Sequence, residues 1–319
     1  MEKSILLVGE PMGLFIANEV GKLEDVENFS LTTCGAEFNV AVGVTRLGGK
    51  VTYMTKLGDD PFGKKIIKMM ERTGISTDEI VFSDSRPTGF MFKEKVDTGD
   101  PGIFYCRKGS AASTLSAADA DRLDFSKFDV VHLTGITPAL SDSCREMAQR
   151  LNKKAKENNC LFSFDPNLRP QLWPSKEKMI EYINGMAAQS DLFLPGINEA
   201  KILIGEDQPQ KIVQKYIALG AKTVVVKVGA KGAYYASRNG ENGFTDGFPV
   251  EKVVDTVGAG DGFAAGVLTG LREGFSLPDA VRRGCAVGAI QVMSKGDNDG
   301  LPYREELDAF MNGNPHWRR

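Results

Sequence analysis

The chain has 319 residues, of which 42% are hydrophobic and 25% are charged, and its formal net charge is −3. This length suffices for a large buried core in one α/β domain with a small appendage. The pI of about 5.7 argues against nucleic acid as a partner, because binding to a phosphate backbone needs a basic surface. No apolar run approaches the length of a membrane span and the N-terminus lacks a signal-peptide pattern, so we expect a cytoplasmic protein without a membrane partner.

Few side chains of this chain suit histidine-based or metal-thiolate chemistry. Of the two histidines, His132 lies in an apolar run and His316 lies near the end of the sequence. The five cysteines are scattered without a Cys-x-x-Cys pair, which is typical of reduced thiols and indicates no zinc site. Any general base is therefore expected to be a carboxylate.

Strand-like and helix-like segments alternate over most of the chain. Continuous apolar strands separated by helices are typical of a doubly wound, mostly parallel sheet with helices on both faces, here a single domain over residues 1–319. In chain order we predict strand 5–9, helix 37–47, strand 51–57, helix 62–72, strand 130–134, helix 142–157, strand 161–165, helix 176–189, strand 192–194, helix 209–219, strand 223–228 and helices 263–272, 278–293 and 303–310.

Two regions, about 12–33 and 88–107, break this alternation. They contain β-like runs without intervening helices, such as 90–96 and 102–105. We predict that they form one small β-sheet, which lies over the ligand edge of the main sheet as a lid. An exposed sheet of this kind can pair with a second copy of the chain, so we expect a homo-oligomer.

The run Asp255-Thr-Val-Gly-Ala-Gly-Asp261 precedes a helix-like segment. The amides of Gly258, Ala259 and Gly260 are expected to converge at the N-terminus of that helix, where unpaired N–H groups favour an anion. Asp261 would lie beside this anion as a base. An anion-binding site next to a carboxylate base is the minimum that transfer of a phosphoryl group to a hydroxyl requires. Taken alone, the run also fits a Gly-rich turn whose Asp complements the helix dipole.

A second glycine-containing run, from Gly58 to Lys65, nearly matches the P-loop pattern. Lys65 stands where that pattern needs a Ser or Thr to bind magnesium. Asp59 and Asp60 would also repel a triphosphate. We therefore exclude a P-loop and interpret the run as a turn that leads into a helix.

Two motifs together resemble the ribokinase-like (PfkB) family of sugar kinases. The first is the run from Cys34 to Ala41 (Cys-Gly-Ala-Glu-Phe-Asn-Val-Ala), followed by the Gly-Asp-Asp turn, and the second is the run that ends at Asp261. The resemblance covers nearly the whole chain. It implies a doubly wound α/β domain with a β lid, ATP as the phosphate donor, and Mg²⁺, and it allows a monovalent cation. It also implies Asp261 as the base toward a sugar hydroxyl, with Gly258, Ala259 and Gly260 as the anion hole.

The resemblance implies roles for further residues. Glu199 corresponds to an acid that organises the metal, although Gly196 replaces the asparagine that usually accompanies it. Met91 stands among the sugar-binding residues where related sugar-acid kinases often have Tyr. The remaining residues contact the sugar (Gly35, Ala36 and Asn39) or the nucleotide (Asn167, Lys227, Gly229, Gly232, Gly258 and Gly260).

Two further runs, 105–113 and 165–173, resemble motifs of those family members that phosphorylate 2-keto-3-deoxygluconate. This sugar acid carries a carboxylate, with which planar guanidinium groups pair bidentately. Arg107 and Arg169 are thus candidate carboxylate ligands, and Tyr105 adds a hydroxyl. By the same resemblance, Asp297 corresponds to an acid that contacts the substrate in this subfamily. Asn298 and Asp299 are neighbouring alternatives.

Two other functions remain open at this point. If the arginines stabilise the protein or bind phosphate, the substrate is a neutral sugar such as fructose or ribose. A non-catalytic sugar- or nucleotide-binding regulator on the same scaffold is the second alternative. The presence of Asp261 and Glu199 argues against the regulator, because a protein that only binds needs no base.

Overall fold

A nine-stranded sheet forms the centre of the computed structural model, which describes residues 3–97, 99 and 101–318. The strand order is β13-β12-β11-β10-β9-β8-β1-β4-β5, and β12 alone runs antiparallel to the other strands of this sheet. The strands are β1 (Ser4–Val8), β4 (Val51–Gly58), β5 (Ser76–Ser83), β8 (Phe128–Thr134), β9 (Leu161–Asp165), β10 (Leu192–Phe193), β11 (Thr223–Lys227), β12 (Gly232–Ser237) and β13 (Asn242–Asp246).

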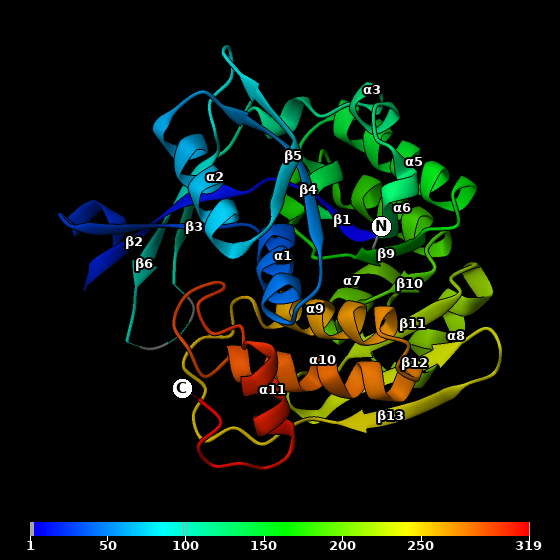
Figure 1. Cartoon of the computed structure of the whole chain (residues 1–319). Coiled ribbons are helices and arrows are strands. Elements are labelled where there is room, and N and C mark those ends of the chain that lie inside the picture. The colour runs from blue at the N-terminus through cyan, green and yellow to red at the C-terminus, as the bar shows by residue number, and fades with distance from the viewer. Residues whose placement is uncertain (1–2, 98, 100, 319) are drawn as a thin grey trace.

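Helices cover both faces of this sheet, which confirms the doubly wound architecture (Figure 1). One face carries α1 (Ala36–Arg46), α2 (Pro61–Thr73), α9 (Ala259–Arg272), α10 (Leu277–Gln291) and α11 (Arg304–Met311). The other carries α3 (Ala117–Asp121), α4 (Ile136–Ala139), α5 (Asp142–Glu157), α6 (Lys176–Ala188), α7 (Ile197–Ile204) and α8 (Pro209–Leu219). No helix in the described part of the chain is both long enough and apolar enough to cross a membrane.

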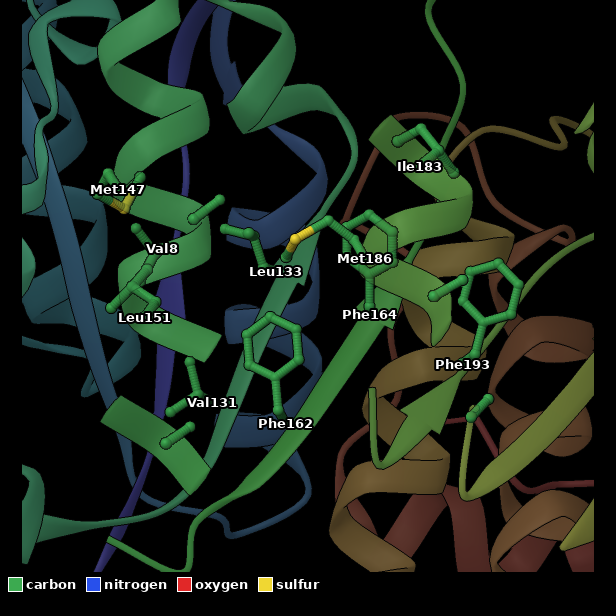
Figure 2. Packing of buried hydrophobic residues seen from close by; sticks show 14 of the residues in the cluster. Val8, Val131, Leu133, Met147, Leu151, Phe162, Phe164, Ile183, Met186 and Phe193 are labelled. Carbon is green, nitrogen blue, oxygen red and sulfur yellow. The ribbon is translucent and has the colours of Figure 1, made fainter. Parts of the chain in front are cut away.

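The central strands are apolar throughout because both of their faces are buried. Leu6 and Val8 of β1 point into one core, whereas Ile5 and Leu7 point into the other, and all four are fully buried. Figure 2 shows the first of these cores, where side chains of β8 and β9 such as Phe162 pack against α5 and α6. Each such side chain contributes roughly 1.5–3 kcal/mol through burial.

The sequence pattern did not predict β5, the β12–β13 hairpin or α7. The strands β5 and β13 lie at the two edges of the sheet and are half exposed, so their alternation of polar and apolar residues is weak. The helix α7 has only eight residues, and it begins with a capping box in which Glu199 accepts the N–H of Gly196.

A second sheet of four strands lies beside the main one, in the order β3-β2-β6-β7 (Figure 1). One face of this small sheet carries Met12, Leu14, Cys34 and Met91, which pack together and are buried. Its strands lie within or beside the ranges 12–33 and 88–107: β2 (Met12–Val20), β3 (Phe29–Cys34), β6 (Phe90–Lys95) and β7 (Ile103–Cys106).

The order of the strands reverses next to β1. The strands β4 and β5 follow on one side of β1, and β8 to β13 follow on the other. In open α/β sheets, ligands bind at such a switch point, in the crevice at the carboxyl ends of the strands. The polar residues at these ends are Glu10 after β1, Thr134 of β8, Asp165 of β9 and Lys227 of β11.

Candidate active site

A cavity of about 320 Å³ lies between the small sheet, the strand ends and the N-terminus of α9. We call it the first cavity. It brings together most of the residues that the sequence indicated, from segments far apart in the chain. These are Gly35, Ala36, Asn39, Met91, Tyr105, Arg107, Asn167, Arg169, Glu199, Lys227, Gly258, Gly260, Asp261 and Asp297.

A second cavity, also of about 320 Å³, lies on the other side of the N-terminus of α9. Gly229, Gly232 and Ala259 line this cavity and not the first one. Both cavities share Lys227, Thr256 and Gly260, so they meet at the anion-binding end of the helix. The apolar wall of the second cavity was not predicted, because its residues lie in irregular segments and helices without a motif (Phe248, Val250, Val253, Phe263 and Val292).

The N-terminus of α9 is suited to bind an anion. Gly258 caps the helix with a φ of 78°, and a Cβ at this position would lie 2.0 Å from the carbonyl oxygen of Asp297. Only glycine fits, and no described side chain caps the helix amides. The Nζ of Lys227 lies 3.6 Å from the position that a Cβ on Gly260 would take, so an ammonium group adds its charge to the helix end.

Asp261 lies in the first turn of α9, and its side chain is buried at the edge of the first cavity. Asn39 donates a hydrogen bond to its Oδ2 at 2.8 Å, and Asn167 donates to its Oδ1 at 3.3 Å. Burial raises the pKa of Asp261 to about 7, against the lowering effect of the Asn39 hydrogen bond and of Lys227 and Arg169. A carboxyl group with a near-neutral pKa in a cavity is suited to act as a general base.

Asn39 is itself held by a third amide. Its Oδ1 accepts a hydrogen bond from the Nδ2 of Asn298 at 3.0 Å, which fixes the orientation that lets Asn39 donate to Asp261. The sequence indicates Asn298 only as an alternative to Asp297. The structure places its side chain under Asn39 and not among the residues that line the first cavity.

Lys227 forms a partly buried ion pair with Asp165 at 2.5 Å. Although burial lowers the pKa of Lys227, the carboxylates of Asp165 and Glu199 more than offset this effect and raise it. Glu199 accepts main-chain N–H groups on both oxygens, from Leu168 at 3.0 Å and from Gly196 at 2.7 Å. Burial also raises the pKa of Glu199. Its carboxylate is thus held rigidly next to the point where the two cavities meet.

The two arginines of the first cavity differ in their partners. Arg107 forms an ion pair with Glu10, a buried residue that sequence reasoning missed, with 2.7 Å between Nε and Oε2. The Oγ of Ser110 donates to the other oxygen of Glu10. Arg169 donates to the carbonyl of Leu168 at 2.9 Å, and no described carboxylate lies within ion-pair distance of its guanidinium group. Arg169 therefore presents the less neutralised positive charge.

Asp297 approaches the first cavity from the loop after α10. Its side chain is buried and lies 3.6 Å from the Nζ of Lys93. Burial raises the pKa of Asp297, and Lys93 acts in the opposite direction. No sequence pattern indicates Lys93, because its position in β6 does not differ from other polar positions of a strand.

The raised pKa of Asp261 predicts a pH dependence of stability. Its ordinary pKa of 3.8 in the unfolded chain rises to about 7 on folding. The unfolded chain therefore loses this proton first, and ionisation destabilises the folded state progressively from about pH 4 to about pH 7. Asp261→Asn removes this effect. We expect the difference in unfolding free energy, variant minus parent, to increase by roughly 2 kcal/mol between about pH 5 and pH 8.

Urea unfolding of both proteins across this pH range measures that difference. The exposed Asp246 provides a control, since Asp246→Asn also removes a carboxylate but lies outside the first cavity, and it is expected to change the unfolding free energy by less than about 0.5 kcal/mol. A difference between Asp261→Asn and the parent that stays constant with pH would show that Asp261 ionises normally in the folded protein.

Known proteins resemble this chain over nearly its whole length. A 2-dehydro-3-deoxygluconokinase from Bacillus subtilis (strain 168) is 44% identical over 312 residues, which cover 98% of this chain and 96% of that protein. The solved structure of a PfkB protein from Polaromonas sp. JS666 is 42% identical, with a TM-score of 0.88 and coverage of 96% of this chain and 99% of that one. A fructokinase from Vibrio cholerae O395, solved with fructose, ADP and a calcium ion, is 25% identical, with a TM-score of 0.83 and coverage of 97% and 98%.

The model of the pfkB family of carbohydrate kinases matches residues 2–304 of this sequence. The fold, the two joined cavities and the glycine-rich N-terminus of α9 agree with the resemblance drawn from the two motifs. This chain belongs to the pfkB family of carbohydrate kinases.

Proposed function

We propose that this enzyme transfers the γ-phosphate of ATP to the terminal hydroxyl of 2-keto-3-deoxygluconate, which yields the 6-phosphate and ADP. The name of the Bacillus subtilis relative supports this substrate. The observation that carries the proposal is the position of Arg107 and Arg169 in the same cavity as the carboxyl of Asp261. Guanidinium groups and a carboxylate base in one cavity suit a substrate that has both a carboxylate and a hydroxyl.

In this proposal the nucleotide occupies the second cavity. The apolar wall of that cavity suits the adenine ring, and Gly229 and Gly232 let the chain turn sharply at its rim. The phosphates then lie at the N-terminus of α9 with Lys227 beside them, where the two cavities join. The sugar acid occupies the first cavity, so that its hydroxyl and the γ-phosphate meet next to Asp261.

Asp261 acts as the general base. As the sugar oxygen bonds to the γ-phosphorus, the carboxylate of Asp261 accepts the hydroxyl proton, the bond from phosphorus to the bridging oxygen breaks, and ADP leaves with that electron pair. Asn39 and Asn167 hold the carboxylate toward the first cavity. The amides of Gly258, Ala259 and Gly260 stabilise the negative charge of the transferred group, which is the larger contribution to phosphoryl transfer.

We propose Mg²⁺ as the metal ion. The described residues contain no group of three or more acidic, histidine or cysteine side chains suited to a metal ion. This fits Mg²⁺, which keeps several waters and binds through substrate phosphates and one or two carboxylates. Glu199 would hold it through the lone pairs that its two main-chain contacts leave free. Bound Mg²⁺ neutralises phosphate charge. Assays in potassium and sodium salts test whether a monovalent cation is also needed.

We propose that the small sheet is a lid over the first cavity. It contributes Met12, Cys34, Met91 and Tyr105 to the wall of the cavity, opposite the strand ends. Closure of such an element excludes water, which otherwise competes with the sugar hydroxyl for the phosphoryl group.

We further infer a homo-oligomer in the cytoplasm. Several large apolar side chains of the small sheet are exposed, which supports burial of this sheet against a second copy (Val20, Leu31, Ile103 and Phe104). All five cysteines are free thiols, which suits a reducing compartment.

A neutral-sugar kinase is the second candidate function, and one observation favours it. Glu10 neutralises Arg107, so the net positive charge at the sugar end of the first cavity rests mainly on Arg169. A single guanidinium group can serve a sugar hydroxyl as well as a carboxylate. The Vibrio cholerae fructokinase shows that a protein of this fold binds fructose.

The choice of sugar is tested by ADP release from Mg·ATP with equal concentrations of 2-keto-3-deoxygluconate, fructose and ribose. We expect a kcat/KM for the sugar acid roughly 30–150-fold above that of either neutral sugar, because a bidentate ion pair contributes about 2–3 kcal/mol. A preference for fructose or ribose would support the second candidate. Binding of the sugar acid without turnover would instead support a regulator.

The role of Arg169 is tested by Arg169→Ala. We expect the KM for the sugar acid to rise roughly 10–100-fold and the KM for ATP to change less than about threefold, since Arg169 lines the first cavity and not the second. Arg169 suits this test better than Arg107, because loss of Arg107 also leaves Glu10 buried without its partner. Equal increases in both KM values would assign Arg169 to phosphate.

A further inference from the structure

Lys93 connects the small sheet to the main domain through a buried ion pair. It lies in β6 and is only 6% exposed. Its Nζ lies 3.0 Å from the Oδ2 of Asp255 and 3.6 Å from the Oδ1 of Asp297. Lys93 lies in neither sequence motif and lines neither cavity. It also takes no part in the mechanism described above.

Both carboxylates belong to loops that shape the anion-binding end of α9. The Oδ1 of Asp255 accepts the N–H of Val257 at 3.0 Å, which fixes the turn directly before Gly258. The carbonyl of Asp297 packs so closely against Gly258 that a Cβ there would lie 2.0 Å away. The buried amide of Gln291 joins the same two loops, because its Nε2 donates to the carbonyls of Val257 at 3.2 Å and of Asp297 at 3.3 Å.

The position of Lys93 between two carboxylates has an electrostatic consequence. Asp297 is buried and Asp255 is partly buried, and the negative charge of Asp255 raises the pKa of Asp297. The ammonium group of Lys93 offsets this repulsion. If it is removed, the two loops are pushed apart, and the amide of Gly258 moves with them. The effect is local to Lys93, since the neighbouring inward position of β6 is the apolar Met91.

We propose that Lys93 is a positioning residue for phosphoryl transfer. Its ammonium group, carried by the small sheet, holds the turn from Asp255 to Gly258 and the loop at Asp297 together, so that the helix amides align with the transferred phosphate. The amides are therefore aligned only while the small sheet is seated on the main domain. Lys93 thus couples the position of the lid to the alignment of the amides that form the anion hole. This inference rests on the proposed kinase activity.

The test compares steady-state kinetics of the parent with Lys93→Ala and Lys93→Met. We expect kcat to fall roughly 10–100-fold in both variants, with each KM changed less than about threefold, because misplacement of the amides affects the transition state more than substrate binding. Lys93→Arg keeps the charge and is expected to retain most of kcat. Propylammonium added to Lys93→Ala is expected to restore kcat at least about fivefold, whereas Lys93→Met, whose side chain fills the space, is not rescued.

Lys95 provides the matched control. It lies two residues further along β6, and its Nζ contacts the exposed carbonyl of Asn18 rather than a carboxylate of the main domain. Lys95→Ala is expected to keep the kcat of the parent, with or without propylammonium.

Two results would overturn the role of Lys93. One is a parent-like kcat in Lys93→Met. The other is a loss of kcat in Lys93→Ala that neither propylammonium nor the Lys93→Arg variant repairs, while thermal unfolding shows a folded protein. Failure of the proposed function is distinguishable from both, because the parent enzyme itself would then release no ADP with any of the sugars.

Discussion

The burial of a carboxylate next to a helix N-terminus is the constraint on which this site depends. Asp261 must stay out of water to have a near-neutral pKa, yet a buried carboxylate is costly unless hydrogen bonds and charges compensate it. Asn39 and Asn167 supply the hydrogen bonds, and Lys227 and the end of α9 supply positive charge. The same groups that make the burial tolerable also attract a phosphate. Base and anion site are therefore one structural unit.

The topology of the sheet brings this unit together. Asn167 follows β9, Lys227 ends β11, and both arrive at the carboxyl edge because the strands are parallel. Helix α9 enters from the far end of the chain and packs against α1, which carries Asn39. The small sheet closes the remaining side through two buried ion pairs, one at Arg107 and one at Lys93. Two charged contacts thus cross between the small sheet and the main domain near the first cavity.

Local patterns predicted those parts of the fold and site that local physics determines. Apolar periodicity placed the central strands and the long helices, because β1, β8 and β9 are buried on both faces. The glycine-rich run before α9 was recognisable because Gly258 must adopt a positive φ against a neighbouring carbonyl. The edge strand β5 and the short helix α7 were missed, since neither buries a continuous apolar face.

The sequence does not reveal which charged residues of the site pair with one another, because the partners lie far apart in the chain. Glu10 and Arg107 are separated by 97 residues, and Lys93 and Asp255 by 162. Nothing in the strand around Lys93 distinguishes it from an exposed lysine such as Lys95. Only the three-dimensional arrangement shows that Lys93 faces the carboxylates of Asp255 and Asp297. The sequence indicates Arg107 only as a substrate ligand, whereas the structure pairs its guanidinium group with Glu10.

The pH dependence of kcat/KM for the sugar kinase reaction is the decisive measurement for the role of Asp261, since this quantity reports ionisations of the free enzyme. We expect kcat/KM to fall about tenfold per pH unit below an apparent pKa of about 7, as the carboxylate of Asp261 becomes protonated and can no longer accept the hydroxyl proton. A kcat/KM that stays constant down to about pH 5 would show that Asp261 has an ordinary carboxyl pKa and is not a buried base of the kind described.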